Sequence, residues 1–374
     1  MKILSPPKLD EHISISNFRE SNIEEIMQLT SMLKKRGKAL RVQMELADEA
    51  RIEQVGKNVT FVINQNINFT DNCIGTCRFC SFKSVSRKEQ SLLKRMSLED
   101  IKIETQKALA RGCTEVCIQG GLDPQINYAY YIDLLKTVKR TAPNIHIHAF
   151  SPAEIAYMSQ LSGENIEDIF KELKKNGLGS FPGTAAEILV DEVRQVICPD
   201  KISTEQWVNI VLTGHRVGIK SSATMMYGHV ESLIDEAEHL VLLKTIQELS
   251  KGFTEFVPLS FMHQNTILYR FLGARPSSSG MHDLALYSAA RLYLGESIYN
   301  IQTSWVKLGP KLAQISLDAG VNDLGGTLFT ENITKKAGGV YGEIMSVEEF
   351  IAIIRDAKRV PVERDTLYNN IKNH

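Results

Sequence analysis

Residues 59–80 read VTFVINQNINFTDNCIGTCRFC, an apolar run followed by three cysteines within eight positions. The run 59–63 predicts a strand, because β-branched and aromatic side chains favour extended backbone. Similar apolar runs alternate with helical patterns through the rest of the chain. The expected strands are 59–63, 115–119, 145–150, 178–181, 222–227, 255–259, 301–305 and 321–324. Repeated strand–helix units imply parallel strands joined by right-handed crossovers.

The expected helices between these strands have amphipathic spacing and recognisable start signals. They are 97–111, 128–141, 166–175, 204–217, 231–249, 283–294, 311–319 and 346–359. Eight strands in a chain of 374 residues favour an α/β fold of the (β/α) TIM-type barrel class, complete or partial. A doubly wound open sheet is the alternative. Residues 1–56 read as an N-terminal helical extension with helices at 21–33 and 40–55, and 57–374 as the barrel with C-terminal helices.

The amino-acid composition of the chain gives no support to nucleic-acid binding or membrane binding as its function. The chain is 43% apolar with a formal net charge of −1, which is enough for a large core and gives no electrostatic reason to bind nucleic acid or an anionic membrane. It contains no apolar stretch of membrane-spanning length. The first residues, MKILSPPKLDEHISI, lack the basic-then-apolar pattern of a signal peptide. We therefore expect a cytoplasmic protein.

Cys73, Cys77 and Cys80 have the spacing C-x3-C-x2-C, with no fourth cysteine or histidine close in sequence. Three thiolates can hold three irons of a [4Fe-4S] cluster and leave the fourth iron open for a ligand. Zinc is the alternative metal, but it needs a fourth protein ligand or a water molecule. A third interpretation, unrelated buried thiols, fits the tight spacing poorly. The loop follows the first expected strand, and barrel enzymes build their sites at strand C-termini.

This cysteine motif, with Phe79 before the third cysteine, resembles the radical S-adenosylmethionine superfamily. The resemblance implies that the open iron binds the amino and carboxylate groups of S-adenosyl-L-methionine, whose reductive cleavage yields a 5′-deoxyadenosyl radical. It also implies that Phe79 packs near the adenine and that Gly120 and Gly121 approach the methionine amino group. Ordinary loop packing for Phe79 and a plain strand-end turn for the glycines are the alternatives. The remaining cysteines, at 113, 117 and 198, are expected to be structural.

Polar residues at the other strand ends predict a substrate pocket rich in donors and acceptors. The candidates are His148, Glu187, Tyr227, His229, His263, Asn322 and Asp323. Asn322 and Asp323 are the strongest pair, because adjacent amide and carboxylate groups suit a ligand with many N–H and hydroxyl groups. Each candidate also has a purely structural alternative: His148 could be a core histidine, Glu187 could cap a helix, and the others could belong to loop structure.

Longer motifs refine the resemblance over nearly the whole chain. They are NFTDNC at 68–73, HAFSPAEI at 148–155, PGTAAEIL at 182–189, TMMYGHVE at 224–231, WVKLGPK at 305–311 and NDLGGT at 322–327. Together they resemble the radical enzymes that form deazaflavins or act on futalosine derivatives. Within that group they are most similar to the family that transfers the 4-hydroxybenzyl group of L-tyrosine to 5-amino-6-(D-ribitylamino)uracil.

The family resemblance implies a reaction and its partners. An adenosyl radical takes hydrogen from the tyrosine amino group, the Cα–Cβ bond breaks, and the benzyl fragment adds to C5 of the uracil. The by-products are 2-iminoacetate, methionine and 5′-deoxyadenosine. An electron donor and a partner radical SAM synthase subunit that closes the deazaflavin ring are expected. The alternatives are a menaquinone-pathway futalosine cyclase or aminofutalosine synthase and, in another class, a non-catalytic metal-binding structural protein.

Overall fold

The computed structural model describes residues 13, 15–81, 95–330, 333–341 and 344–374. Its centre is a six-stranded parallel sheet in the order β2-β3-β4-β5-β6-β7. These strands are β2 (Asn64–Asn68), β3 (Glu115–Gln119), β4 (His146–Ala149), β5 (Ser180–Phe181), β6 (Lys220–Tyr227) and β7 (Phe253–Ser260). Consecutive strands pair with each other, as expected for successive βα units.

A second sheet has the order β10-β9-β1-β8 and closes the open side of the first. It contains β1 (Asn58–Val62), β8 (Asp323–Gly326), β9 (Val360–Arg364) and β10 (Asn370–Asn373). β1 leads into β2 after a single residue, and single parallel bridges join Phe256 to Ile301 and Gln302 to Asp323. Backbone pairing therefore passes from β7 through residues 301 and 302 to β8 and β1. The predicted TIM-type α/β barrel is confirmed.

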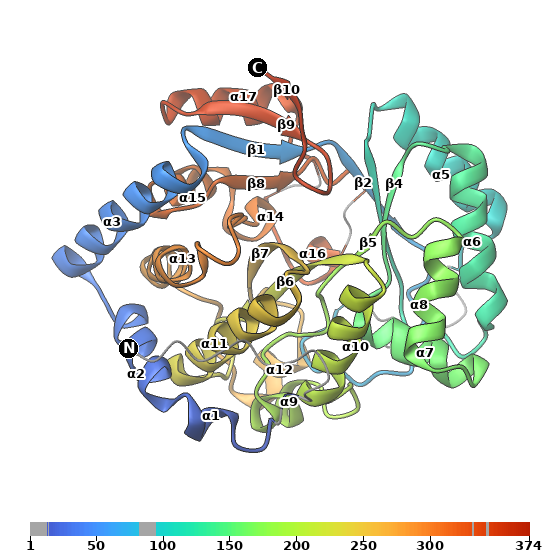
Figure 1. Ribbon diagram of the computed structural model, residues 1–374, viewed down its shortest axis with the longest axis horizontal. Coiled ribbons are helices and arrows are strands. Elements are labelled where there is room, and N and C mark those ends of the chain that lie inside the picture. Colours follow the sequence, from blue (N-terminus) through green and yellow to red (C-terminus); the bar gives the residue numbers. More distant parts are fainter. Residues whose placement is uncertain (1–12, 14, 82–94, 331–332, 342–343) are drawn as a thin grey trace.

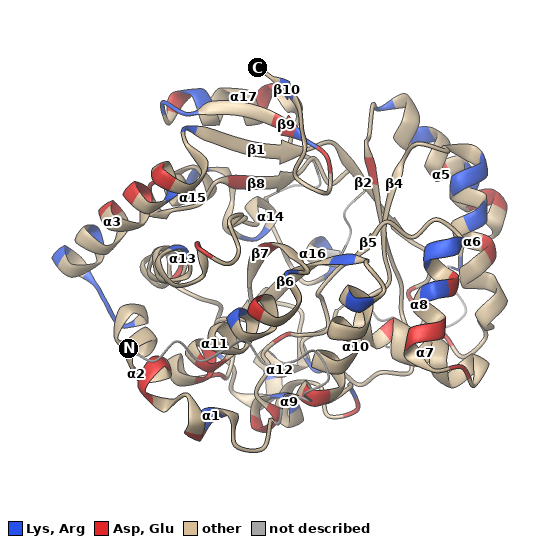
Figure 2. Cartoon of the chain, viewed as in Figure 1, with Lys and Arg blue, Asp and Glu red and all other residues tan. Residues whose placement is uncertain are grey.

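Helices surround the strands, and many of the charged residues belong to these helices (Figures 1 and 2). The first part of the chain forms α1 (Phe18–Ser21), α2 (Ile23–Leu33) and α3 (Gly37–Val55). The barrel helices are α5 (Leu98–Ala110), α6 (Tyr128–Thr141), α7 (Pro152–Ser162), α8 (Ile166–Lys175), α9 (Asp191–Ile197), α10 (Thr204–Arg216), α11 (Leu233–Ser250), α12 (Ile267–Leu272) and α13 (Gly280–Leu294). The last part adds α14 (Trp305–Leu308), α15 (Pro310–Ser316), the 3-10 helix η1 (Leu317–Ala319), α16 (Ile333–Lys336) and α17 (Val347–Asp356).

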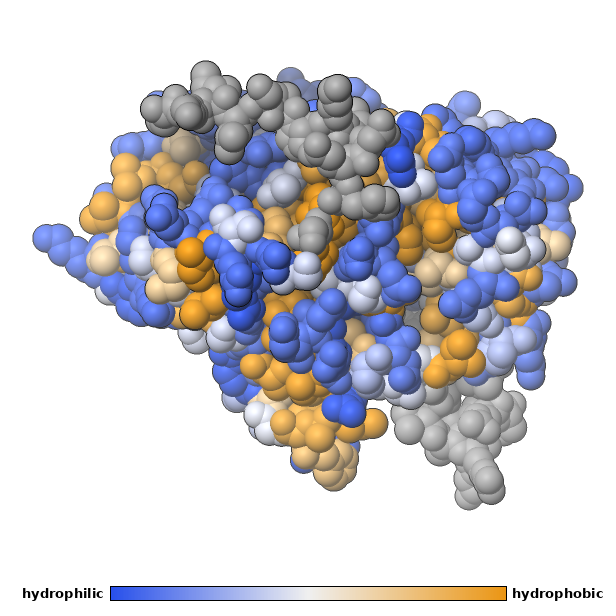
Figure 3. Space-filling model, turned by 60° about the horizontal axis from the view of Figure 1, so that its bottom comes forward, coloured by the Kyte–Doolittle hydropathy of each residue, from blue (hydrophilic) through white to orange (hydrophobic). Residues whose placement is uncertain are grey.

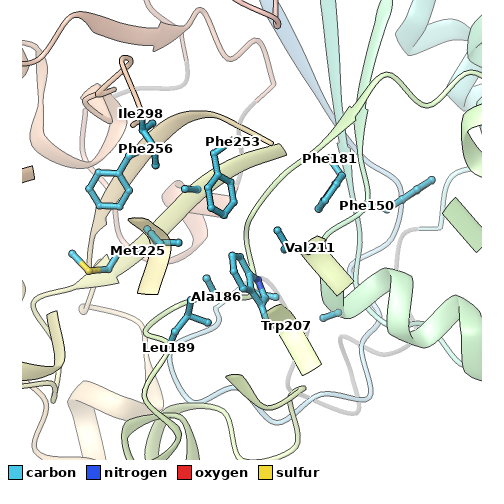
Figure 4. Close-up of a cluster of buried hydrophobic side chains, with 14 of the residues drawn as sticks. Phe150, Phe181, Ala186, Leu189, Trp207, Val211, Met225, Phe253, Phe256 and Ile298 are labelled. Atoms are coloured by element: carbon cyan, nitrogen blue, oxygen red, sulfur yellow. The ribbon is translucent and has the colours of Figure 1, made fainter. Parts of the chain in front are cut away.

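Local sequence explains where several helices begin. Ser97, Ser151, Ser203, Ser232 and Ser346 each cap a helix through a reciprocal capping box. In this motif the serine hydroxyl and an acidic or amide side chain three residues later satisfy backbone N–H groups that the helix leaves free. Between the helices and the sheet, Trp207 and Val211 of α10 point toward Phe253 of β7 (Figure 4). The N-terminal helices α2 and α3 pack against α11 and α13.

Three expectations for the strands and the last helix need correction. The segment 301–305 forms only two bridges before α14 begins at Trp305, whose indole N–H donates to the Gly326 carbonyl. The predicted helix 346–359 ends at Asp356, because residues 360–364 pair with β1 as strand β9. β2 was not predicted, because asparagine is uncommon in strands and its sequence is Asn-Gln-Asn-Ile-Asn.

The end of β9 and the residues that follow it form a floor under the N-terminal ends of the barrel strands. Arg364 pairs with Asp323 of β8, and the Thr366 hydroxyl donates to Glu115, the first residue of β3. All four side chains are buried.

On the outside of the protein, apolar patches interrupt the hydrophilic surface (Figure 3). Of the helices that the structure describes, none combines the length and apolar character needed to cross a bilayer.

Candidate active site

Asp123 anchors the loop that carries the three cysteines. Its carboxylate accepts hydrogen bonds from the Thr70 hydroxyl at 2.9 Å, from Asn72 Nδ2 at 2.8 Å, and from the Arg95 guanidinium at 2.9 and 3.0 Å. The side chain of Asp123 is fully buried, and despite that burial these donors and the Gln125 amide hold its pKa below the ordinary value. A charged, fully bonded carboxylate therefore fixes the start of the cysteine loop.

Gly120 and Gly121 allow this loop to lie directly against β3. A Cβ added to Gly121 would lie 2.1 Å from the Asn72 carbonyl oxygen, and one added to Gly120 would lie 2.5 Å from the Phe69 ring. No side chain fits at either position without moving the cysteine loop or the end of β2. The glycines are thus explained by contacts within the protein. Contact with a bound methionine stays a prediction for both.

The environment of the thiols fits ligands to iron. The Cys73 sulfur accepts hydrogen bonds from the backbone N–H groups of Leu122 at 3.3 Å and Gly75 at 3.4 Å, which fix its position in the loop. Burial raises the pKa of Cys77 to about 12 although Lys201 opposes the shift, so without a bound metal its thiol is neutral. A thiolate bound to a metal is deprotonated by the positive charge of that metal.

The described residues contain no group of three or more His, Cys, Asp or Glu side chains placed around a single metal ion. A four-iron cluster differs from a single ion, because each cysteine binds a different iron and the sulfurs need not converge on one point. Cys73, Cys77 and Cys80 all line one cavity of about 470 Å³. The three thiols of this loop therefore fit a cluster better than a single zinc ion.

The same cavity has the groups needed to hold a second, organic ligand. Phe79, Gly120 and Gly121 line it together with Glu154, Tyr157 and Lys201. Lys201 pairs with Glu187 at 2.5 Å and lies over the Phe79 ring, 5.4 Å from its centroid. Although burial opposes the charged form, Glu187 raises the pKa of Lys201, so the cavity wall carries a cation at neutral pH. Glu187, one of the predicted residues, does not itself line this cavity as far as the structure describes it, but it is paired with Lys201, which does.

Glu154 connects the end of β3 to the start of α7 in the cavity wall. Its carboxylate accepts hydrogen bonds from the Gly120 amide at 3.0 Å and from the Ser151 amide and hydroxyl, both at 2.7 Å. Burial nevertheless raises the pKa of Glu154 to about 7. Perturbed, buried acids in clefts are candidates for functional groups. The sequence contained a signal for the helix start that places Glu154, because Ser-Pro-Ala-Glu at 151–154 is a capping box with proline at the first helical position.

A second cavity, of about 290 Å³, lies within the barrel. It is lined by alternate residues of the strands, which face inward because side chains alternate along a strand. The set includes Asn64 and Asn66 of β2, Glu115, Cys117 and Gln119 of β3, His148 of β4, and Glu255, Val257 and Leu259 of β7. His148 therefore lines this cavity and not the cysteine cavity. Its Nδ1 lies 2.7 Å from the Ser180 hydroxyl, and burial lowers its pKa to about 4.

Three other predicted residues have partners within the protein. The Tyr227 hydroxyl donates to Asp283 at 2.8 Å, and the side chain is fully buried. His229 accepts the Val230 amide at its Nδ1 and lies 2.9 Å from Glu231. His263 packs edge-to-face on Tyr269, with centroids 4.5 Å apart. None of the three is among the residues that line the two cavities in the described part of the chain.

Asn322 and Asp323 take part in the barrel framework. Asn322 Oδ1 accepts Arg291 Nη2 at 2.6 Å and the Ile301 amide at 2.9 Å, which holds the irregular segment beside β8. Asp323 accepts the Thr60 hydroxyl and pairs with Arg364. Neither residue lines the two cavities as far as the structure describes them. A direct contact between these two side chains and a substrate stays a prediction.

Two family models match different parts of the chain. Residues 67–243 match the model of the Radical SAM superfamily, and residues 250–373 match the model described as CofH/MqnC C-terminal region. The chain is 50% identical over 329 residues to a 5-amino-6-(D-ribitylamino)uracil–L-tyrosine 4-hydroxyphenyl transferase of Methanopyrus kandleri, covering 88% of this chain and 89% of that protein. Proteins of the same name from Methanococcoides burtonii and Archaeoglobus fulgidus are each 51% identical, over 88% and 87% of this chain and 91% and 92% of theirs.

Solved structures with the same fold are much more distant in sequence. Methylornithine synthase superposes with a TM-score of 0.70 at 18% identity, covering 92% of this chain and 97% of that one. The [FeFe]-hydrogenase maturase HydG superposes with a TM-score of 0.67 at 15% identity, over 94% of this chain and 80% of that one. These two support the fold, and the sequence relatives give the family. The chain belongs to the radical SAM superfamily and, within it, to the family of 5-amino-6-(D-ribitylamino)uracil–L-tyrosine 4-hydroxyphenyl transferases.

Proposed function

We propose that this enzyme cleaves the Cα–Cβ bond of L-tyrosine and transfers the 4-hydroxybenzyl group to 5-amino-6-(D-ribitylamino)uracil, in the biosynthesis of a deazaflavin coenzyme. The observation that carries the proposal is about 50% identity to transferases of this name over nearly the whole chain. The presence of two cavities, one at the cysteines and one within the barrel, supports it.

Cys73, Cys77 and Cys80 would hold a [4Fe-4S] cluster, and Phe79, Gly120 and Gly121 would contact S-adenosyl-L-methionine in the same cavity. When bound there, this pair supplies the hydrogen-abstracting radical that starts the reaction. The chain itself orients the substrates and keeps water from the reacting atoms, which is how a barrel contributes most to radical chemistry. An electron donor and a partner radical SAM synthase subunit that completes the deazaflavin ring belong to the same proposal.

The test is an anaerobic assay of the reconstituted enzyme with S-adenosylmethionine, a chemical reductant, tyrosine and the ribitylaminouracil. The expected product is a hydroxybenzyl adduct of the uracil, identified by its mass, together with 5′-deoxyadenosine. Replacing the ribitylaminouracil with a futalosine-derived acceptor is the control for the menaquinone-pathway alternative. If S-adenosylmethionine is consumed and the uracil adduct never forms, the proposed transfer is wrong.

A further inference from the structure

Two acceptor atoms in the barrel cavity lack any donor. Glu255 lines the cavity from β7 and is 8% exposed, and Asn66 lines it from β2. Among the residues that the structure describes, no hydrogen-bond donor reaches Glu255 Oε2 or Asn66 Oδ1, and both atoms are buried. A buried acceptor without a donor destabilises the folded protein, because it loses the hydrogen bonds that water would give it. Such a cost is tolerated where a ligand supplies the missing donor.

Two charged neighbours of Glu255, Glu115 and Arg364, are satisfied within the protein. Glu115 accepts Asn64 Nδ2 at 3.0 Å and the Thr366 hydroxyl at 2.7 Å, and Arg364 is paired with Asp323. Most of the cavity floor is therefore a completed polar framework. Among the described residues the Tyr368 hydroxyl, which interacts electrostatically with Glu255, is also buried without a hydrogen-bond partner. Tyr368 does not line the cavity, whereas Glu255 does, which argues that the free oxygen of Glu255 faces a ligand.

The depth of Glu255 in the cavity indicates which part of a ligand would contact it. The cavity is lined both by Glu115 and Glu255, near the floor, and by Gln119 and Leu259, near the strand C-termini. Four residues of strand separate Glu255 from Leu259, which is about 13 Å at 3.3 Å per residue. The cysteine cavity begins beyond the C-terminal end of β3, at Gly120. Reacting atoms must lie at that end, so the deep end receives a part of the substrate that does not react.

Of the two proposed substrates, the uracil has the longer part that does not react, because its ribityl chain extends farther from the reacting carbon than the phenol ring of tyrosine does. Both the amino group of tyrosine and C5 of the uracil take part in the chemistry, whereas the ribityl chain does not. A ribityl chain carries several hydroxyl groups, each of which can donate and accept. Burial raises the pKa of Glu255 to about 7, with Arg364 opposing the shift. A hydroxyl group suits this side chain in either protonation state.

We propose, on the basis of the function proposed above, that Glu255 and Asn66 form the subsite for the ribityl chain of the acceptor. The polyol chain enters the barrel first and lies along β7 and β2. Its hydroxyl groups donate to Glu255 Oε2 and Asn66 Oδ1. The uracil ring then stays at the C-terminal ends of the strands, with C5 toward the cysteine cavity. The two residues thereby position the acceptor and select for its polyol.

The experiment compares two acceptors, 5-amino-6-(D-ribitylamino)uracil and 5,6-diaminouracil, which has no ribityl chain. Binding of each is measured by anaerobic titration calorimetry on the reconstituted holoenzyme, and tyrosine is titrated separately. We expect Glu255→Leu and Asn66→Ala each to raise the Kd of the ribityl compound roughly ten-fold or more. We expect the Kd values of diaminouracil and tyrosine to be unchanged. Glu205→Leu, on the exposed first turn of α10, is the matched control and should change none of them.

The outcomes separate this inference from the proposed function. If the wild type binds and converts the ribityl compound but Glu255→Leu and Asn66→Ala bind it equally well, the subsite is wrong and the function stands. Equal weakening of both acceptors, or weaker tyrosine binding, also overturns the subsite. If the wild type neither binds nor converts the ribityl compound, both proposals fall. Glu255→Met has nearly the same length as the native side chain but lacks a strong hydrogen-bonding group, and it serves in place of Glu255→Leu should the latter not fold.

Discussion

Arg364 donates to both carboxylate oxygens of Asp323, at 2.6 Å from Nε to Oδ2 and 3.1 Å from Nη2 to Oδ1. The pair is buried on both sides and joins β9 to β8 across β1. Planar, two-point pairing of this kind is the strongest form of an ion pair in proteins. Removing one partner leaves a buried charge without compensation, which is costly even where the intact pair contributes little.

Asp323→Asn is therefore expected to lower the free energy of unfolding by about 3–5 kcal/mol. Urea denaturation followed by circular dichroism measures the change. Asp318→Asn is the control, because Asp318 is 68% exposed in its pair with Arg359 and exposed pairs contribute at most about 1 kcal/mol. Similar effects of the two substitutions would contradict a structural role for the Arg364 pair.

Substitution of any one of Cys73, Cys77 and Cys80 by alanine should abolish cleavage of S-adenosylmethionine. Each substitution removes one of three thiolates, and a four-iron cluster held by two is not retained. Iron and acid-labile sulfide analysis, with 5′-deoxyadenosine measured by chromatography, gives the answer. Cys113→Ala, at a buried thiol outside the loop, should keep both metal content and cleavage. A cluster that survives in a loop variant would identify other ligands.

Gly121→Ala should displace the cysteine loop. The new Cβ would lie 2.1 Å from the Asn72 carbonyl oxygen, which is backbone and cannot rotate away. We expect loss of most of the iron on reconstitution while the far-ultraviolet circular dichroism stays native. Gly280→Ala adds the same methyl group at the start of α13, where the nearest atom is 3.6 Å away, and should reconstitute normally. Full iron loading of Gly121→Ala would show that the loop accommodates a Cβ.

His239 should make the protein less stable as the pH falls. Its Nδ1 accepts the Leu189 amide at 2.9 Å and its Nε2 donates to the Thr224 carbonyl at 3.0 Å, so the folded state holds the neutral ring. Burial lowers its pKa to about 3, whereas in the unfolded chain it is about 6.5. Between these values the unfolded chain binds more protons, so stability present above pH 6.5 is lost toward pH 3.

From pH 7 to pH 5 this single group should remove about 2 kcal/mol of stability. Urea unfolding at both pH values, for the wild type and for His239→Gln, isolates the contribution. The variant is expected to be less stable at pH 7 and to lose about 2 kcal/mol less than the wild type on acidification. Parallel losses in the two proteins would show that His239 does not titrate on unfolding.

Features set by local sequence were predicted well. The helix 128–141 agrees with α6 at both ends, and the cysteine loop and the pair Gly120 and Gly121 line one cavity as their positions after neighbouring strands require. Periodicity and strand order suffice for these features, because parallel strands bring their C-terminal ends to the same edge. The missed helix α7 had a local signal too, the capping box at Ser151.

Features set by distant pairing could not be read from the sequence. β2 is polar because Asn64 and Asn66 face the barrel cavity, so its composition argues against a strand. β9 exists because it pairs with β1, some three hundred positions earlier. For the same reason the sequence could not show the protein partners of Asn322 and Asp323, because Arg291 and Arg364 belong to other elements of the fold.

The floor of the barrel also constrains the order of events during synthesis. Thr60 pairs with Asp323, and Asp323 with Arg364, so the first strand is not fully enclosed until residue 364 has left the ribosome. At 5–20 residues per second, the roughly 300 residues between them take about 15–60 s to make. The base of the nascent barrel therefore cannot close during that time, and the cavity lined by Glu115 and Glu255 is enclosed only after translation has passed that point.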